Sequence, residues 1–388
     1  MAIDEQQVLI LAPDGVRRKP YKETLIKANL RVDFVSTLAC VQPAIMEMHP
    51  ICFVHDWSTI EASQAEQFQL AMAKKPDTVQ FYRYIIADNV DTKMLAYASD
   101  ALINKVMTYN KAHTNLGQEI VMDIGNRGKR DINNALWAIR HECQNITPAA
   151  LDMKIESLYN SFPQDKEVRL EYANLCIKND KFEIAGDIAQ KILRIEENNL
   201  RAINIMSRIA MKGKNFEDAI KILQEAREFS AYDNERALLL ADAFYGNGNL
   251  DEAFACYEEA HHLTEGGSKE AITGMGKIYV EQDELESAIA LFRSGLSEEE
   301  SAAFFNNAAV LAVNEGKLES AIKLYESAIK TLRTNHLKPR IYFNLALAYR
   351  KGGDLSHAKK FLKKSLRLDN NYEKAKRQLD SITGKNAS

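Results

Sequence analysis

Residues 343–358 read FNLALAYRKGGDLSHA, and the same pattern recurs along the second half of the chain. Its last alanine returns at intervals of 34, 34, 35, 33 and 37 residues, as Ala185, Ala219, Ala253, Ala288, Ala321 and Ala358. Twelve residues before each alanine stands a small residue: Ala173, Ser207, Ala241, Gly276, Ala309 and Ala346. Two helices can cross closely only where both side chains are small. The repeat therefore predicts a series of helical hairpins.

The units show the sequence features of two helices and a turn. The first helix of the last unit, Ile341–Arg350, has apolar residues at i, i+3, i+4 and i+7. A glycine or a polar residue then marks the turn. Phe343–Leu355 with Ala358 resembles the tetratricopeptide repeat (TPR) family, as does Asn307–Ala328. The resemblance implies an all-α TPR solenoid.

We expect six TPR units over residues 165–371, then a capping helix and tail over 372–388. Upstream, residues 122–130 contain two glycines and three basic residues, which predicts a linker. We interpret residues 122–164 as this linker and a helical adaptor. Residues 132–165 could form a degenerate seventh repeat.

Residues 1–121 follow a different pattern. Short apolar runs, typical of buried strands, alternate with segments that favour helices. The runs lie at 8–12, 32–36, 51–54, 80–87 and 101–104. This alternation predicts an α/β domain with a five-stranded parallel sheet and helices on both faces.

The N-terminal segment also resembles a known family. His49–Asp56 (HPICFVHD) is similar to the third strand of the receiver domain of response regulators, and Leu102–Lys105 (LINK) to its fifth strand. The resemblance implies a flavodoxin-like fold. It also implies that Asp56 is a candidate phospho-acceptor, with Lys105 and Asp14 as its companions.

Two departures from the receiver pattern count against phosphorylation. Receivers hold Mg²⁺ with a pair of acids after the first strand, because this hard cation needs oxygen ligands. Here only Asp14 lies near that place, beside Pro13, and Ile85–Asp88 offers no hydroxyl residue after the fourth strand. We therefore favour a pseudo-receiver, with a functional receiver phosphorylated on Asp56, or an unrelated α/β domain, as alternatives.

The composition favours a cytoplasmic protein. The net charge of −4 argues against general nucleic-acid binding, which needs clustered positive charge. No apolar run approaches the roughly 18 residues of a membrane-spanning helix, and residues 1–7 do not resemble a secretion signal. The five cysteines are far apart and are expected to be reduced thiols.

No catalytic motif stands out. The eight histidines include no pair with helical zinc-site spacing, and HExxH, GxSxG and GxGxxG are all absent from the sequence. We therefore expect no enzymatic activity, no metal and no cofactor.

The TPR resemblance implies a concave groove lined by the first helices. Its expected lining residues are Asn174, Asn204, Arg208, Lys277, Asn306, Asn307, Asn314, Arg340, Asn344, Arg350 and Lys351. Asparagine both donates and accepts hydrogen bonds, so it can hold a peptide backbone, while the basic residues favour an acidic partner. Lys277, Asn307, Arg340 and Asn344 resemble in part a carboxylate clamp, although Asn344 stands where a second basic residue is needed.

We expect a protein partner, a peptide or helix of acidic character, in this groove; a solvated, unoccupied groove is the alternative. We interpret the whole chain as a non-enzymatic adaptor or scaffold in bacterial signalling or assembly. Its receiver-like domain would dock a signalling protein, regulate the array or self-associate. The alternative function is a response regulator with the TPR array as its output domain.

Overall fold

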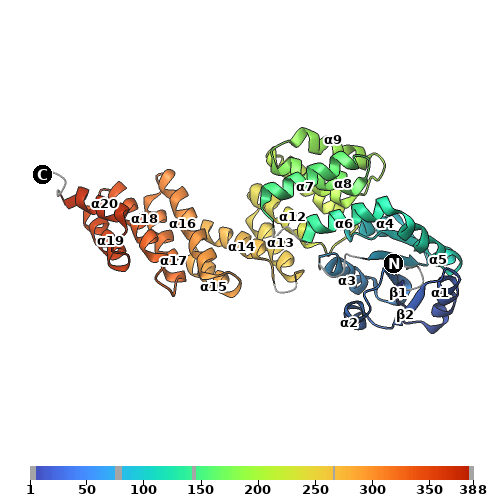
Figure 1. Cartoon of the computed structure of the whole chain (residues 1–388). Helices are drawn as coiled ribbons and strands as arrows, with labels where there is room; N and C mark the ends of the chain where they lie inside the picture. The colour runs from blue at the N-terminus through green and yellow to red at the C-terminus, as the bar shows by residue number, and fades with distance from the viewer. Residues whose placement is uncertain (1–5, 75–80, 142–145, 265–266, 384–388) are drawn as a thin grey trace. The chain divides into compact units, whose positions relative to one another are not determined.

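The computed structural model describes residues 6–74, 81–141, 146–264 and 267–383. It divides into two compact units, unit 1 over residues 1–247 and unit 2 over residues 248–388 (Figure 1). Each unit is described by itself.

Unit 1 begins with a five-stranded parallel sheet in the order β2-β1-β3-β4-β5. The strands are β1 (Gln7–Leu11), β2 (Arg31–Val35), β3 (Cys52–Asp56), β4 (Tyr82–Ala87) and β5 (Lys105–Thr108). The helices between and after them are α1 (Gly15–Lys27), α2 (Leu38–Met48), the short 3-10 helix η2 (Trp57–Thr59), α3 (Ala62–Lys74), α4 (Thr92–Asp100) and α5 (Tyr109–Gly125). This is the strand order of flavodoxin-like folds, and it confirms the predicted α/β fold class.

Helices cover both faces of the sheet, because alternate residues of a strand point to opposite sides. From β1, Val8 joins a buried cluster with Leu25 of α1 and Leu116 of α5. Its neighbour Leu9 joins another with Val41 of α2. Because the five strands are parallel, their carboxyl ends lie at one edge of the sheet, where β3 ends with Asp56.

The fifth strand lies later than the sequence predicted. Residues 101–104 were expected to form it, whereas β5 is Lys105–Thr108. Leu102 has a left-handed backbone (φ +54°), and the N–H of Ile103 donates to the carbonyl of Ala98 at 2.8 Å. These residues close the end of α4, so the strand starts only after them.

The segment 122–130, expected to be a linker, is helical apart from Asn126. Ile120 and Ile124 pack into the same buried cluster as Val8. This packing stabilises α5 through its last turn. The chain therefore passes almost directly from the α/β domain into the helical array.

The remaining helices of unit 1 are α6 (Arg127–His141), α7 (Pro148–Ser161), α8 (Lys166–Lys178), α9 (Phe182–Leu193), α10 (Leu200–Lys212), α11 (Phe216–Arg227) and α12 (Asn234–Gly246). The first helices begin at polar caps: Asp165, Asn199 and Asp233 each accept from a backbone N–H of the helix that follows. Residues of α6, α7 and α8 share one apolar cluster, so α6 and α7 pack against the first predicted repeat.

Unit 2 consists of α13 (Leu250–His262), α14 (Lys269–Glu281), α15 (Leu285–Gly295), α16 (Glu298–Asn314), α17 (Leu318–Thr331), α18 (Lys338–Lys351), α19 (Leu355–Leu368) and α20 (Glu373–Thr383). Ser297 and Glu300 form a capping box at the start of α16. The turns between paired helices use left-handed residues, namely Asp283, Gly316 and Gly353. This run of paired helices confirms the predicted TPR solenoid.

The repeat alanines occupy fully buried positions of the array. All six are fully buried: Ala185, Ala219, Ala253, Ala288, Ala321 and Ala358. Among the small residues opposite them, Ala173 lies in one buried cluster with Ala185. The alanine spacing therefore correctly identifies a buried residue in each of the six predicted repeats.

Candidate functional sites

Asp56 is fully buried at the carboxyl end of β3, and its carboxylate accepts hydrogen bonds from Arg17, Ser58 and Tyr21. Arg17 Nη1 lies 2.9 Å and Ser58 Oγ 2.7 Å from Oδ1, and the Tyr21 hydroxyl lies 2.8 Å from Oδ2. Arg17 also pairs with Asp88, which follows β4. A guanidinium from α1 therefore neutralises Asp56 from within the domain.

This arrangement leaves little room for a ligand at Asp56. Burial, and then the nearby Asp56 carboxylate, raises the pKa of Tyr21, so its hydroxyl stays protonated and donates. The Arg17 guanidinium lies 4.3 Å from the ring centroid of Tyr109, a cation–π contact that holds it in place. An incoming cation or phosphodonor would have to displace Arg17 to reach Asp56.

The other two candidate residues do not join these contacts. Asp14 accepts from a backbone N–H in the first turn of α1 at 2.8 Å, so it acts as the helix cap. Lys105 is the first residue of β5, and its ammonium lies 2.8 Å from Glu119 and 2.9 Å from Asp123, both on α5. The structure therefore does not bring Lys105 to Asp56.

Sequence reasoning missed Arg17 and Tyr21 as partners of Asp56. They lie four residues apart on α1 and so share one face of the helix. Because α1 follows β1 closely, its first turns lie at the sheet edge where β3 ends. The available signal was the basic pair Arg17–Arg18, in the region where a receiver would carry acids.

The α/β domain packs on α10 and α12 through the end of α4. Arg236 of α12 donates to Asp100 Oδ1 at 2.9 Å, and the two side chains are 1% and 4% exposed. Ser230 Oγ donates to the other oxygen of Asp100 at 3.2 Å. Beside this pair, Ala96 of α4 and Leu200 of α10 share a buried apolar cluster. We call this contact the α4 interface.

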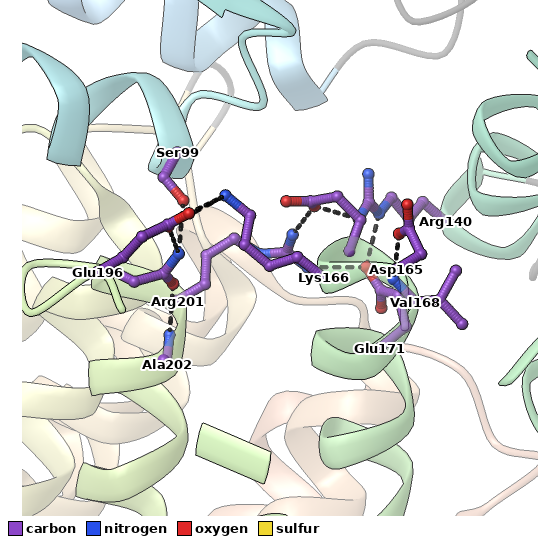
Figure 2. A network of polar contacts seen from close by, with 11 residues as sticks. Ser99, Arg140, Asp165, Lys166, Val168, Glu171, Glu196, Arg201 and Ala202 are labelled. Carbon is purple, nitrogen blue, oxygen red and sulfur yellow. Dashed lines mark hydrogen bonds and ion pairs between the residues drawn. The ribbon is translucent and has the colours of Figure 1, made fainter. Parts of the chain in front are cut away.

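A network of charged residues adjoins the α4 interface (Figure 2). Arg140 of α6 and Arg201 of α10 both donate to Glu171 of α8, at 2.6 and 2.8 Å, and both pair with Glu167. Burial alone would raise the pKa of both glutamates, but the two arginines outweigh it and lower the pKa. The network ties α6, α8 and α10 together.

Asn199, the cap of α10, links this network to α4. Its Nδ2 donates to Ser99 Oγ at 3.1 Å and to Glu196 at 2.8 Å, and its Oδ1 caps α10 by accepting from the N–H of Ala202. Lys166 pairs with Glu196 at 3.0 Å. The cap of α10 is therefore also a contact with the α/β domain.

Three predicted groove residues come together in unit 1. Arg208 Nη1 donates to Asn174 Oδ1 at 3.1 Å and pairs with Glu235 at 2.6 Å. Asn174 and Asn204 line a cavity of about 240 Å³, which Leu70 of α3 also lines. Residues of the α/β domain and of α8, α10 and α12 therefore line this cavity together.

Three others come together in unit 2. Asn344 Nδ2 donates to Asn306 Oδ1 at 2.9 Å, and Asn306 Nδ2 lies 3.4 Å from Asn307 Oδ1. Lys351 Nζ donates to the carbonyl of Val313 at 2.6 Å. These contacts join α16 to α18, and we call Asn306, Asn307 and Asn344 the asparagine cluster.

The remaining predicted groove residues are on the surface of unit 2. Lys277, Asn314 and Arg340 are exposed, and Arg350 hydrogen-bonds Gln378 of α20. Within the described ranges, no three histidine, cysteine or acidic side chains gather as they would around a metal ion. Nor does any described helix combine the length and apolarity needed to cross a membrane.

Comparison with known families identifies the repeats. Residues 273–336 match the family model described as tetratricopeptide repeat. Residues 306–383 match a model described as a domain of unknown function (DUF6340). The hairpins within residues 273–336 are therefore similar to tetratricopeptide repeats, as the sequence predicted. Neither match reaches the α/β domain, and a comparison with curated proteins found no match.

Several solved structures of TPR proteins are similar to part of this chain. A TPR protein from Parabacteroides merdae is 12% identical, with a TM-score of 0.37, over 64% of this chain and 99% of its own. PilF of Pseudomonas aeruginosa is 13% identical, with a TM-score of 0.36, over 56% and 97%. YrrB, described as a TPR protein with an unusual peptide-binding site, is 14% identical, with a TM-score of 0.31, over 49% and 96%.

Proposed function

We propose that this chain is a non-enzymatic adaptor that holds an acidic peptide or helix of a protein partner in the groove of unit 2. TPR proteins generally mediate protein–protein interactions, which supports a protein partner. The asparagine cluster is the observation that carries the proposal. Its amides can both donate to and accept from a peptide backbone, and the exposed Lys277 and Arg340 would add a preference for negative charge.

We also propose that the α/β domain is a pseudo-receiver with a docking role. The pairing of Asp56 with Arg17 supports this, because the guanidinium supplies the positive charge that a bound cation would otherwise supply. The α4 interface supports a docking role within the chain. The free thiols Cys40, Cys52, Cys176 and Cys256 suit a cytoplasmic setting.

The groove proposal can be tested with the full chain and an array of acidic peptides. We expect the double variant Lys277→Glu with Arg340→Glu to bind about tenfold or more weakly, a loss of about 1.4 kcal/mol. The fold should be unaffected, because exposed charge changes rarely alter stability by more than about 0.5 kcal/mol. Binding should also weaken as salt is raised, since exposed charges are screened over about 8 Å at physiological ionic strength.

A matched control is Lys191→Glu with Lys221→Glu, which makes the same charge change on exposed positions of the second helices α9 and α11. This variant should bind the peptides as the parent does. Loss of binding in the control, with retention in the groove variant, would move the partner away from the groove of unit 2.

A further inference from the structure

The helix α19 presents a wholly basic face to solvent. The helix contains five basic residues and no acidic one. They recur at every fourth position in two adjacent rows, so all five lie on one side of the helix, opposite its buried side. We call this set the basic face: Lys359, Lys360, Lys363, Lys364 and Arg367, of which all but Lys364 are exposed.

The basic face has no acidic partner in its own chain. Among the residues that the structure describes, none of its five side chains forms an ion pair with a carboxylate. Like charges four residues apart on a helix, such as Lys359 and Lys363, repel one another. A partner that brings negative charge to this face would relieve the repulsion.

The repeat register explains why Lys360 is unpaired. Lys360 of α19 and Lys323 of α17 each stand two residues after a repeat alanine. Lys323 pairs at 2.7 Å with Asp283, the left-handed turn residue of the preceding unit. The corresponding turn residue for Lys360 is Gly316, which has no side chain to offer.

The helix α13 carries the opposite charge. It contains four acidic residues and neither lysine nor arginine. Asp251 and Glu258 stand two turns apart and so share one side of the helix, and Glu252 adjoins them. All three are exposed and form no ion pair with a described residue. We call Asp251, Glu252 and Glu258 the acidic face.

The repeat register also explains why Asp251 is unpaired. Asp251 of α13 and Glu286 of α15 each stand two residues before a repeat alanine. Glu286 pairs at 2.6 Å with Lys330 of the next second helix, nine residues after its alanine. The same position after α13 is Ser297, which carries no charge. Within unit 2, α13 and α19 are thus second helices with unpaired charges of opposite sign.

We propose that the basic face of one copy of this chain binds the acidic face of a second copy. The two helices are similar in length, with 13 residues in α13 and 14 in α19, so the faces can lie side by side. Because the two faces are different surfaces, the contact is heterologous, and it adds copies in a row unless the rotation between them closes a ring. It uses second helices, whereas the proposed groove is built on first helices.

Sedimentation equilibrium of the full chain at low and high salt tests this. We expect the mass at low salt to exceed that of one chain and to rise with protein concentration. At high salt it should return to the mass of one chain, because exposed charges are screened. Lys360→Glu with Lys363→Glu, and separately Asp251→Asn with Glu258→Lys, should each weaken association about tenfold or more. Both variants should fold as the parent does, since all four side chains are exposed.

A mixture of these two variants gives the sharpest measurement. The first keeps an intact acidic face and the second an intact basic face, so one parental contact can form between them. The mixture should therefore associate about as tightly as the parent and stop at the mass of two chains. The matched control Lys191→Glu with Lys221→Glu reverses two exposed lysines on α9 and α11, and should associate as the parent does.

Every other result overturns the proposal. A parent that keeps the mass of one chain at low salt makes no such contact. Association that survives both pairs of substitutions places the contact on another surface, and a mixture that stays unassociated shows that α13 and α19 are not each other's partners. If the parent stays a single chain but binds vesicles containing phosphatidylserine, and Lys360→Glu with Lys363→Glu does not, the basic face binds an anionic membrane instead.

Discussion

Asp100 and Arg236, which lie 136 residues apart in the sequence, form an ion pair of 2.9 Å that is almost completely buried. It joins the last residue of α4 to α12. Ser230 contacts both partners: its hydroxyl donates to Asp100, and its backbone carbonyl accepts from Arg236. The ion pair is therefore part of a larger set of hydrogen bonds in the α4 interface.

Breaking one side of this pair should be costly. Asp100→Ala removes the closer carboxylate partner of the buried Arg236 guanidinium and leaves Asp233 at 3.6 Å, so we expect a loss of about 3–5 kcal/mol in the free energy of unfolding. The double variant Asp100→Leu with Arg236→Met should lose less than the sum of the two single changes. Denaturant titrations of the four proteins measure this coupling.

A control for the ion-pair experiment is Glu235→Ala, which removes the exposed partner of Arg208. That pair should contribute only about 0–1 kcal/mol. If Asp100→Ala were as mild as Glu235→Ala, the α4 interface would not be held by its buried charges.

The pH dependence of stability should reveal the charged network of Figure 2. The pKa of Glu171 is lowered in the folded chain because Arg140 and Arg201 outweigh its burial. Its stabilising effect is therefore present above the unfolded pKa of about 4.3 and is lost as the pH falls through the lower folded value. Glu171→Gln should be less stable than the parent at neutral pH, and the gap should narrow below about pH 4.

Urea titrations of the parent and Glu171→Gln between neutral and acid pH check this. Glu196→Gln serves as the control, since it alters a more exposed ion pair and should change stability by about 0–1 kcal/mol. A gap between the parent and Glu171→Gln that stays constant across the whole range would contradict the role assigned to the two arginines.

Asp56 should resist phosphorylation. Its carboxylate is buried and paired with Arg17, and Asp14, the acid that follows the first strand, caps α1. We expect acetyl phosphate to add no mass to the full chain, and beryllofluoride with Mg²⁺ to leave its melting temperature unchanged. A mass increase that disappears in Asp56→Asn would instead support the response-regulator alternative.

Two glycines in helices should respond in opposite ways to alanine. A methyl group on Gly276 would clash with the ring of the fully buried Phe292, so Gly276→Ala should cost about 1–3 kcal/mol. On Gly186 the methyl group would meet only Ile209, at 3.7 Å, and the substitution should stabilise by about 0.5–1 kcal/mol. Thermal melts of both variants decide the matter, and shifts in the same direction would show that the crossing at Gly276 is looser than described.

The repeat could be predicted from the sequence because its cause is local. Each alanine, such as Ala185, is buried against a residue of its own hairpin, here Ala173, so the constraint recurs within one unit of the sequence. The sheet could be predicted for a similar reason, since apolar runs such as Val8–Leu11 are buried on both faces.

The features that the sequence did not predict depend on contacts at helix ends or between residues that are far apart in the chain. The turn that closes α4 after Asp100 depends on backbone hydrogen bonds, such as that from Ile103, which apolar patterning does not encode, so the fifth strand was predicted a few residues too early. The pairing of Arg17 with Asp56 depends on how α1 lies over the sheet edge. The packing of the α/β domain near Asn204 depends on the α4 interface, whose residues are far apart in the sequence.

The span of the α4 interface also bears on how the chain is synthesised. TPR hairpins form from neighbouring residues, and the α/β domain is complete by the end of α5, so both can fold early. Asp100, however, must wait for Arg236, which leaves the ribosome 136 residues later. During that interval the carboxylate and the apolar face of α4 around Ala96 remain in water. Until α10 and α12 have been synthesised, the nascent α/β domain therefore keeps this apolar surface open to a chaperone.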